Sequence, residues 1–277
     1  NDHYNIEFFK NEKMNGHGEE PSVLLASRIL MADLCICLSQ YSLAHTFVRQ
    51  ELNRQNGKFL SMPSLTSELF VHKGLRANYK SHSSEVELLT DLMSKGDGFS
   101  LMRDGCILEG NINGRLGNCC PGFVSDKYLL ASPPDIESNI SPVESSVNGI
   151  FKVNSAISLP SIGILPEPIT LEIREGYIIR IDGQHEIVHF LSDYFGDVRS
   201  RKIIAELGVG FNPNIKPNGS MLFDEGARGF VHLGFGDNST VGGENYSDRH
   251  IDFISYVDEL KIDDKIIVKK GNLCFAE

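Results

Sequence analysis

The first part of the chain alternates between helix-like and strand-like patterns. Residues 41–56 carry apolar positions at helical spacing, and Gly57 stands where a C-terminal cap is expected. Apolar runs at residues 33–39 and 58–62 flank this helix and are typical of buried parallel strands. This order of strand, helix and strand predicts an open α/β domain with a mostly parallel sheet. Two further helices are predicted at residues 67–75 and 84–95.

After about Gly98 the pattern changes to strands and turns. Residues 150–154 and 169–175 alternate between apolar and polar side chains, and residues 177–181 continue after a hairpin turn. One helix, at residues 186–195, is expected to interrupt these strands. The second part of the chain is therefore predicted to be a β-rich α+β domain.

The boundary between the two predicted domains lies in residues 122–134, where Pro133 and Pro134 would stiffen the connection. We therefore assign residues 1–126 to the α/β domain and residues 127–277 to the β-rich domain. A length of 277 residues suits two domains. The 41% hydrophobic content is ordinary for a soluble globular protein.

Residues 249–254 alternate between polar and apolar side chains, so on a strand His250 and Asp252 project from the same face. Imidazole and carboxylate together suit zinc, manganese, iron or cobalt. His-x-Asp is also a common short pattern, and two surface residues need no ion. His185 and His189, four apart on a predicted helix, could bind a metal too, but such pairs more often lie on a solvated face.

Charge and hydropathy restrict the class of partner. The formal charge of -11 argues against a nucleic-acid surface and against anionic membranes. No apolar stretch reaches the roughly 18 residues of a spanning helix, because Asp33 interrupts the longest one, at residues 29–38. The chain does not begin with methionine, and residues 1–20 lack a signal pattern. We expect the sequence to begin inside a longer chain or after a disordered lead.

Six cysteines in a chain of this length do not form the dense disulfide framework of a small secreted domain, so a reducing cytoplasmic location is expected. Cys35 and Cys37 would share one face of an apolar strand and are interpreted as core. Cys119 and Cys120 lie in a turn-rich stretch, where a nucleophilic thiol would still need a nearby base.

A series of short segments occurs in an order that resembles a known family. It looks like the thermophilic metallo-aminopeptidase family, of the aminopeptidase T and S type, together with its relative 2,5-dihydroxypyridine 5,6-dioxygenase, a mononuclear non-haem iron enzyme. The two branches share a fold but differ in chemistry. The resemblance covers about residues 130–271. Its segments are Pro-Val-Glu-Ser-Ser-Val-Asn-Gly at 142–149, Gly-Val-Gly-Phe-Asn-Pro at 208–213, Asp-Glu at 224–225, the stretch around Val-His-Leu-Gly at 229–238, Gly-Gly at 242–243 and His-Ile-Asp at 250–252.

The resemblance implies five metal ligands, which gives the β-rich domain its expected metal-binding role. The first family glutamate matches Glu137, although the residues around it depart from the usual motif. The second matches Glu206, before a Leu-Gly-x-Gly turn. The first histidine matches His232, and the final His-x-Asp matches His250 and Asp252. A histidine is expected near the Glu206 position in the dioxygenase branch, so a carboxylate there favours the peptidase-like set.

Two other positions follow from the resemblance. The peptidases carry a tyrosine shortly after the first histidine, but residues 237–240 read Asp-Asn-Ser-Thr. Tyr246 is the available substitute. Arg115 resembles a family position near an interdomain cleft and could hold a substrate carboxylate by a two-pronged hydrogen bond. A surface ion pair is the alternative for Arg115.

The leading hypothesis from the resemblance is a cytoplasmic metalloprotease, an aminopeptidase-type hydrolase that cleaves a peptide or amide. One or two divalent ions, zinc, cobalt or manganese, would activate water for this reaction. The first alternative keeps a single iron on His250, Asp252 and either Glu206 or His232, and cleaves an electron-rich ring with oxygen. The second is a catalytically inactive homologue that binds a peptide. A peptide or small-molecule substrate and a homodimer or larger homo-oligomer are the expected partners, with no nucleic acid and no membrane.

Overall fold

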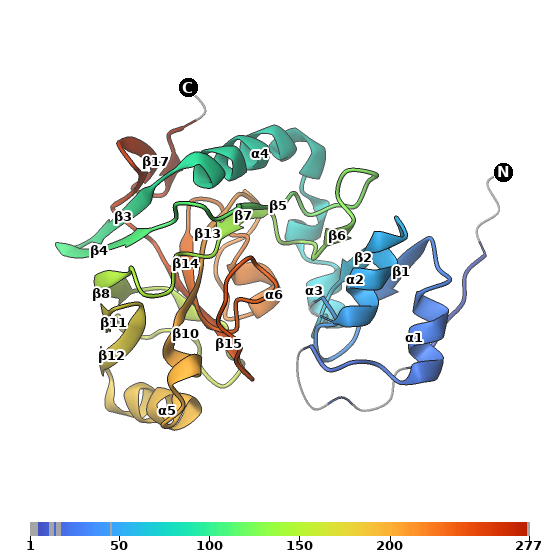
Figure 1. The fold of residues 1–277 in the computed structure, drawn as a ribbon, viewed down its shortest axis with the longest axis horizontal. Helices are drawn as coiled ribbons and strands as arrows, with labels where there is room; N and C mark the ends of the chain where they lie inside the picture. Colours follow the sequence, from blue (N-terminus) through green and yellow to red (C-terminus); the bar gives the residue numbers. More distant parts are fainter. Residues whose placement is uncertain (1–4, 11–13, 15–17, 45, 276–277) are drawn as a thin grey trace. The chain divides into compact units, whose positions relative to one another are not determined.

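The computed structural model describes residues 5–10, 14, 18–44 and 46–275 (Figure 1). The chain forms two compact units. Unit 1 comprises Asn1–Val71 and Phe123–Pro133, and unit 2 comprises His72–Gly122 and Pro134–Glu277. The predicted boundary after residue 126 falls inside the second segment of unit 1, and it stays a prediction.

Unit 1 is a small α/β unit around a three-stranded sheet. Its strands pair in the order β1-β2-β6, and both pairings are parallel. The predicted strand–helix–strand order is therefore present, with β2 almost as predicted. The elements are α1 (Val23–Ile29), β1 (Leu34–Cys37), α2 (Phe47–Arg54), β2 (Lys58–Ser61), α3 (Ser67–Phe70) and β6 (Leu130–Ala131).

Helix α2 is shorter than its predicted range because polar groups fix both ends. The Thr46 side chain caps its N-terminus, and the Glu20 carboxylate accepts hydrogen bonds from the first two helical N–H groups. At the other end Asn56 takes the left-handed conformation, with φ of 64°, and Gly57 donates its N–H to the Leu52 carbonyl. Asn56 thus adopts the conformation for which Gly57 was the expected residue.

Unit 2 consists mainly of two antiparallel sheets. The eight-stranded sheet has the order β12-β11-β8-β4-β3-β16-β17-β18, and the seven-stranded sheet has the order β10-β9-β15-β14-β13-β7-β5. The strands of the first are β3 (Gly98–Arg103), β4 (Cys106–Asn111), β8 (Asn148–Val153), β11 (Ile169–Arg174), β12 (Tyr177–Asp182), β16 (Glu259–Ile262), β17 (Lys265–Lys269) and β18 (Asn272–Leu273). Those of the second are β5 (Asn118–Cys120), β7 (Glu137–Ile140), β9 (Ala156–Ile157), β10 (Gly163–Ile164), β13 (Ile204–Gly210), β14 (Val231–Gly236) and β15 (His250–Ser255).

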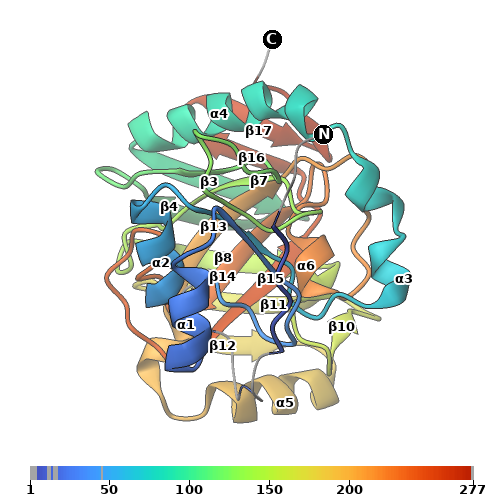
Figure 2. The same ribbon diagram turned by 90° about the vertical axis from the view of Figure 1, so that its right-hand side faces the viewer.

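Helices cover unit 2 at two ends. In both ribbon views α4 (Tyr79–Lys95) and α5 (His185–Phe195) lie at opposite ends of the unit (Figures 1 and 2). The predicted helix at residues 186–195 and the hairpin of β11 and β12 are confirmed. The predicted helix at residues 67–75 is instead α3 followed by a short 3-10 turn, η1 (Lys73–Arg76). The remaining helical elements are η2 (Arg199–Lys202) and α6 (Met221–Asp224).

One hydrophobic core joins the two sheets of unit 2. Alternate residues of β13, β14 and β15 enter it, and Phe235 and Phe253 meet there edge to face at 5.6 Å. The residues between them face the other way. Because the period of a strand is 2, each of these strands sends one row of side chains into the core and leaves the other row on the opposite face. That opposite face carries the polar residues described below.

No helix of the described residues is both long and apolar enough to cross a membrane.

Candidate metal centre

The predicted ligands come from four neighbouring strands of the seven-stranded sheet. Strands β7, β13, β14 and β15 lie side by side in this order (Figure 2). Glu137 is on β7, Glu206 on β13, His232 on β14, and His250 and Asp252 on β15. The predicted strand at residues 249–254 is confirmed by β15, in which His250 and Asp252 occupy alternate positions of one face.

A glycine lies across the sheet from every one of these side chains. The register places Gly234 between Glu206 and Asp252, and places Gly208 opposite His232. The same pattern pairs Gly236 with His250 and Gly210 with Glu137. Directly opposed residues have Cβ atoms only about 4.5–5.5 Å apart, so a larger residue at the glycine positions would fill the space over which the ligand side chains extend.

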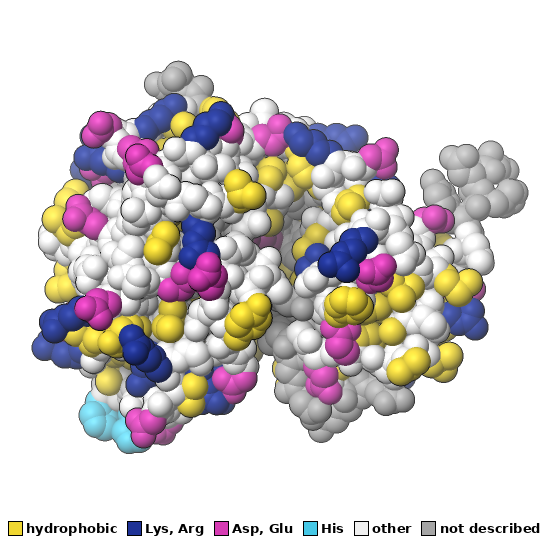
Figure 3. All heavy atoms as spheres, in the orientation of Figure 1, with side chains coloured by type: hydrophobic (Ala, Val, Ile, Leu, Met, Phe, Trp, Pro, Cys, Tyr) yellow, Lys and Arg dark blue, Asp and Glu magenta, His cyan; other side chains and the backbone are white. Residues whose placement is uncertain are grey.

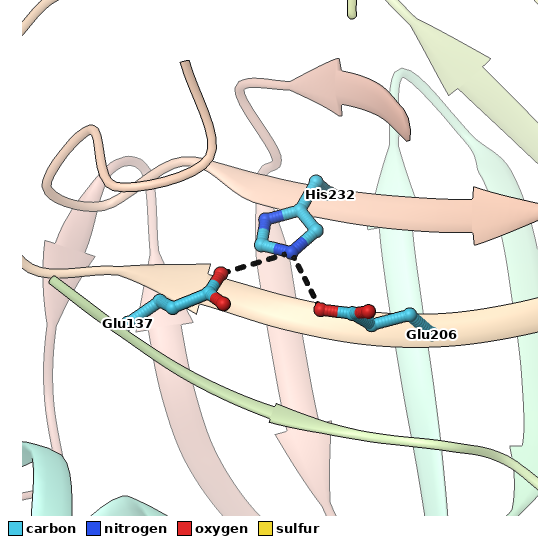
Figure 4. Close-up of side chains that lie close together, drawn as sticks. All are labelled: Glu137, Glu206 and His232. Carbon is cyan, nitrogen blue, oxygen red and sulfur yellow. Dashed lines mark hydrogen bonds and ion pairs between the residues drawn. The ribbon is translucent and has the colours of Figure 1, made fainter. Parts of the chain in front are cut away.

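Three of the predicted ligands converge on one point (Figure 4). Nε2 of His232 lies 3.2 Å from Oε2 of Glu137 and 3.3 Å from Oε1 of Glu206. All three side chains are buried, and His232 is only 1% exposed. Two donors about 2.1 Å from one ion, at angles of about 90–110°, are about 3.0–3.4 Å apart. The spacing of the three donor atoms therefore suits ligands of a single ion.

The other two predicted ligands form a pair that Glu206 connects to the first three. Nε2 of His250 lies 3.1 Å from Oδ1 of Asp252 and 3.8 Å from Oε2 of Glu206. The two carboxylate oxygens of Glu206 thus face two different imidazoles, His232 with Oε1 and His250 with Oε2. The sheet brings all five predicted ligands into one continuous cluster.

Polar neighbours hold the ligands from behind. Nδ1 of His250 lies 2.7 Å from the Asp237 carbonyl oxygen, which can only accept, so Nδ1 carries a hydrogen. In the neutral imidazole the lone pair is then on Nε2, which faces the cluster. Nδ2 of Asn139 donates to Oε1 of Glu137 at 2.7 Å. This bond leaves Oε2 of Glu137 directed at His232.

Two further carboxylates, Asp135 and Glu225, face the same cluster. Burial raises the pKa of Asp135 well above its usual value, and the neighbouring Glu137 adds to this effect. Burial likewise raises the pKa of Glu225, with Asp252 as the strongest neighbouring charge. Glu225 also makes a hydrogen-bonding contact with Asp252 and accepts a 3.3 Å hydrogen bond from Ser158. Five acidic groups thus surround two imidazoles.

The imidazoles respond to this negative surrounding. Burial alone would lower the pKa of His250, but Asp252 and Glu206 raise it to about 10. For His232 as well, burial acts downwards while Glu137 and Glu206 raise the pKa well above its ordinary value. Burial raises the pKa of Glu206. Several buried acids around two bases need a compensating positive charge, because an unpaired buried carboxylate is costly.

The cluster fits a divalent metal ion. Its donors are imidazole nitrogens and carboxylate oxygens, the ligands preferred by zinc, iron and manganese. Three buried atoms in it have no hydrogen-bond partner among the described residues: Oδ1 of Asp135, Oε2 of Glu137 and Nδ1 of His232. Oε2 of Glu137 lies within ion-pair distance of His232 without the geometry of a hydrogen bond. Glu137, Glu206 and His232 therefore form a candidate three-residue metal site.

Arg115 lies in a different set of contacts from the five ligands. Its Nη2 is 2.5 Å from Oε2 of Glu144, and its Nη1 donates to the Gly242 carbonyl at 2.7 Å. These contacts correspond to the ion-pair alternative, and a role of Arg115 in substrate binding stays a prediction. Tyr246, the available substitute for the peptidase tyrosine, is 78% exposed.

The other candidate groups lie in environments that indicate no metal site. His185 and His189 lie on α5, where exposed imidazoles gather (Figure 3), and His189 pairs with Asp193 at 3.2 Å. Cys35 and Cys37 pack in the small core of unit 1, as predicted.

Cys120 lies on β5 opposite Glu137 rather than in a loop. Burial and the carboxylates of Glu137 and Asp135 raise the pKa of its thiol well above the ordinary value, which disfavours a nucleophilic thiolate.

Sequence reasoning did not identify Asp135, Asn139 and Glu225 as parts of the site. A signal for two of them was present, since Asp135, Glu137 and Asn139 occupy alternate positions along one extended segment. Glu225 follows α6 and reaches the cluster from a loop, so no periodicity could indicate it. Its only sequence signal was the Asp-Glu pair at 224–225 within the resemblance.

Comparisons with known proteins give this centre a family. The family model described as 2,5-dihydroxypyridine 5,6-dioxygenase matches residues 135–275. The 2,5-dihydroxypyridine 5,6-dioxygenase of Pseudomonas putida KT2440 is 29% identical over 148 residues, which cover 49% of this chain and 42% of that protein. The match thus spans less than half the length of this curated relative.

Two solved structures share the fold. The 2,5-dihydroxypyridine dioxygenase of Pseudomonas putida KT2440 has a TM-score of 0.78 and 19% identity, with 99% of this chain and 82% of that chain covered. Wild-type AmpT from Thermus thermophilus has a TM-score of 0.65 and 14% identity, with 91% and 80% covered. At these identities the likeness shows the fold alone. The mixed α/β class with antiparallel sheets is common to both.

These comparisons correct the functional prediction. The leading hypothesis, an aminopeptidase-type hydrolase or metalloprotease, is wrong, because the family model and the curated relative are both dioxygenases. The error came from the Glu206 carboxylate, which was taken to separate the peptidase from the dioxygenase branch. AmpT supports the aminopeptidase side of the resemblance only in fold. The match over residues 135–275 contains every predicted ligand, and the chain belongs to the 2,5-dihydroxypyridine 5,6-dioxygenase family.

Proposed function

We propose that the chain is a ring-cleaving dioxygenase that acts on an electron-rich hydroxylated aromatic ring such as a dihydroxypyridine. The observation that carries the proposal is that the family match, residues 135–275, contains all five clustered ligands, from Glu137 to Asp252. The chain has the buried nitrogen and oxygen donors that such a reaction requires. Activity and substrate belong to the proposal, because the curated relative is matched over 42% of its length.

The donor set supports iron as the metal. Two imidazoles and one carboxylate form the facial set of non-haem iron oxygenases, which leaves positions open for substrate and oxygen. Glu137, Glu206 and His232, whose donor atoms converge, would hold the ion, and His250 and Asp252, connected to them through Glu206, would supply the second imidazole and a further carboxylate. Iron held there would supply the redox chemistry that lets oxygen react with the ring. Zinc, cobalt and manganese suit the same donors, but they were predicted as the ions of the hydrolase, which the comparisons do not support.

The residues around the centre control access and orientation. Among the five ligands only His250 is clearly accessible, with 32% of its side chain exposed, so we infer that substrate approaches from the His250 side. The Asp237 carbonyl fixes the His250 ring and keeps its Nε2 lone pair directed at the cluster. The buried side of the cluster, around His232, excludes bulk water. Exclusion of water favours reaction of the bound ring over side reactions.

The test is oxygen uptake by iron-loaded protein. The full chain is loaded with Fe(II) without oxygen and mixed with 2,5-dihydroxypyridine in aerated buffer, and both oxygen consumption and loss of the substrate absorbance are recorded. We expect stoichiometric uptake of oxygen. His250→Ala should lose iron and activity together, while His189→Ala, which changes an exposed imidazole on α5, should keep both.

Two outcomes would overturn the proposal. One is iron-loaded wild-type protein that consumes no oxygen with any hydroxylated pyridine or hydroxylated benzene tested. The other is a His250→Ala variant with unchanged activity, because the ring chemistry would then not depend on this centre.

A further inference from the structure

The loop between β14 and β15, residues 237–249, is connected to the candidate metal centre in two ways, one direct and one through other side chains. At one point the Asp237 carbonyl bonds Nδ1 of His250 at 2.7 Å. At the other the Val241 carbonyl accepts a 3.1 Å hydrogen bond from Nδ2 of Asn118, on β5. The first contact acts on a ligand directly. The second begins a chain of amides that ends at another ligand.

The chain of side-chain hydrogen bonds passes from Asn118 through Asn139 to Glu137. Nδ2 of Asn118 also donates to Oδ1 of Asn139 at 2.8 Å, and Nδ2 of Asn139 donates to Oε1 of Glu137 at 2.7 Å. Asn118 and Asn139 are direct partners in the β5–β7 register, so their side chains lie on one face. This path of hydrogen bonds connects the two neighbouring strands β5 and β7 on one face of the sheet.

The orientation of both side-chain amides, those of Asn118 and Asn139, is fixed by their hydrogen-bond partners. Nδ2 of Asn118 donates to two oxygens, the Val241 carbonyl and Oδ1 of Asn139. Oδ1 of Asn139 therefore faces Asn118, and its NH₂ group must face Glu137. If Asn139 turned over, its oxygen would meet the Glu137 carboxylate and repel it. Asn118 thus decides which end of the Asn139 amide Glu137 meets.

The loop at the start of this chain is itself held in place. The Glu144 carboxylate accepts hydrogen bonds from Nδ2 of Asn238 at 2.9 Å and from the Glu244 N–H at 2.6 Å. Arg115 binds the same carboxylate and the Gly242 carbonyl. Asn238 is fully buried. The Val241 carbonyl is therefore a fixed acceptor for Asn118 rather than part of a free loop.

We propose that Asn118 is a positioning residue of the metal centre, which acts through Asn139 to orient Glu137 and connects it to the loop that orients His250. The inference rests on the proposed function in so far as it assumes a metal at this centre. Partners that orient ligands typically contribute 10- to 100-fold in metal affinity. Asn118 makes no ligand bond of its own, so its effect must pass through Asn139.

The experiment uses Co²⁺ as the probe. The metal-free full chain is titrated with Co²⁺, and the dissociation constant and the visible d–d spectrum are measured for wild type, Asn118→Ala, Asn139→Ala and the double variant. We expect each single variant to bind Co²⁺ about tenfold more weakly and to show an altered spectrum. The double variant should bind no more weakly than Asn139→Ala alone, because both changes interrupt one path.

A second variant and a control separate orientation from folding. Asn118→Asp keeps the size of the side chain but cannot donate, so Asn139 is expected to turn over and the affinity to fall as in Asn118→Ala. Asn148→Ala is the control, since Asn148 also bonds two backbone groups but lies on β8 of the other sheet. It should leave the Co²⁺ affinity and spectrum unchanged.

The inference is overturned if Asn118→Ala and Asn118→Asp bind Co²⁺ with the wild-type constant and spectrum, even if their melting temperatures fall. Additive losses in the double variant would also overturn it. Failure of the proposed function looks different, because it appears as absent oxygen uptake in a wild-type protein that binds Co²⁺ normally. The Co²⁺ titration needs no turnover, so the two results are read independently.

Discussion

Gly208 lies opposite His232 in the register of β13 and β14, and a Cβ on Gly208 would come 2.1 Å from Nε2 of His232. No real contact is that short, so the imidazole would have to leave its position between Glu137 and Glu206. Gly208→Ala is therefore expected to reduce the metal content several-fold while the sheet stays folded. Metal analysis together with circular dichroism checks both parts of this prediction.

The matched control for Gly208→Ala is Gly98→Ala on β3 of the other sheet. A Cβ there would meet a carbonyl oxygen at 3.1 Å, so it is tight as well but far from any ligand strand in the order of the sheets. It should keep the full metal content. Equal metal retention by Gly208→Ala and Gly98→Ala would contradict the view that the glycine row makes room for the ligands.

Metal removal is expected to lower the free energy of unfolding of unit 2 by more than the loss of a single metal–ligand bond would. Without a cation the carboxylates of Glu137, Glu206 and Asp252, with Asp135 and Glu225 beside them, repel one another in a buried place. Ligand linkage gives about 3–4 kcal/mol of stabilisation at metal concentrations of about 100–1,000 times the dissociation constant. Thermal unfolding with EDTA and with saturating Fe(II) or Co²⁺ should differ by several degrees. Identical melting curves would show that the centre holds no metal.

The ligand strands could be predicted from local pattern. His250 and Asp252 alternate with apolar residues, and β15 places both on one face, as the period of 2 requires. The convergence of Glu137 with them could not be derived from pattern, because it depends on three cross-strand registers between β7 and β15. Only the resemblance connected these residues before the structure did.

The pattern of hydrophobic and polar residues predicted least about side chains whose role depends on contacts with residues far away in the sequence. Arg115 was predicted to bind substrate because it resembles a family position near an interdomain cleft, but its partner Glu144 is 29 residues further along the chain. Asn118 and Asn139 are polar residues of short strands with no recognisable motif. Their roles depend on sheet pairing, which no local pattern of hydrophobic and polar residues encodes.

Arg115→Met should lower stability rather than substrate affinity alone. The side chains of Arg115 and Glu144 are 13% and 18% exposed, and the change leaves Glu144 without its cation. Loss of a charged hydrogen bond in such a place costs about 1–3 kcal/mol. Urea unfolding measures this cost. Arg174→Met removes an exposed contact with Glu172 and serves as the control, with an expected effect within about 0.5 kcal/mol.

The two roles of Arg115 predict different kinetics. If Arg115 only anchors the loop, the folded fraction of Arg115→Met keeps a KM for 2,5-dihydroxypyridine close to the wild-type value. If Arg115 instead binds the substrate, which has ring hydroxyl groups and no carboxylate, Arg115→Met raises the KM and leaves the unfolding free energy unchanged. We expect the first pattern, and the second would restore the sequence-based prediction.

Asp224 should make stability depend on pH in an unusual direction. It is fully buried and accepts hydrogen bonds from the N–H groups of Asn218 and Gly219. Burial outweighs these bonds and raises its pKa from 3.8 to about 6. Between about pH 4 and 6 the folded state then binds more protons than the unfolded state, so this group's contribution to stability falls as pH rises. The full change is at most about 3 kcal/mol.

Comparison with Asp224→Asn isolates this contribution, because the amide keeps an acceptor oxygen but does not titrate. The free energy of unfolding of wild type minus that of Asp224→Asn should decrease from pH 4 to 6 and stay level above about pH 7, in EDTA so that metal binding plays no part. Asp264→Asn, which changes an exposed carboxylate, is the control. If the Asp224 difference instead rises with pH, the N–H groups stabilise the charged carboxylate more than burial destabilises it. Residues 218–220 would then form an anion-binding turn, and the prediction of a raised pKa for Asp224 would be wrong.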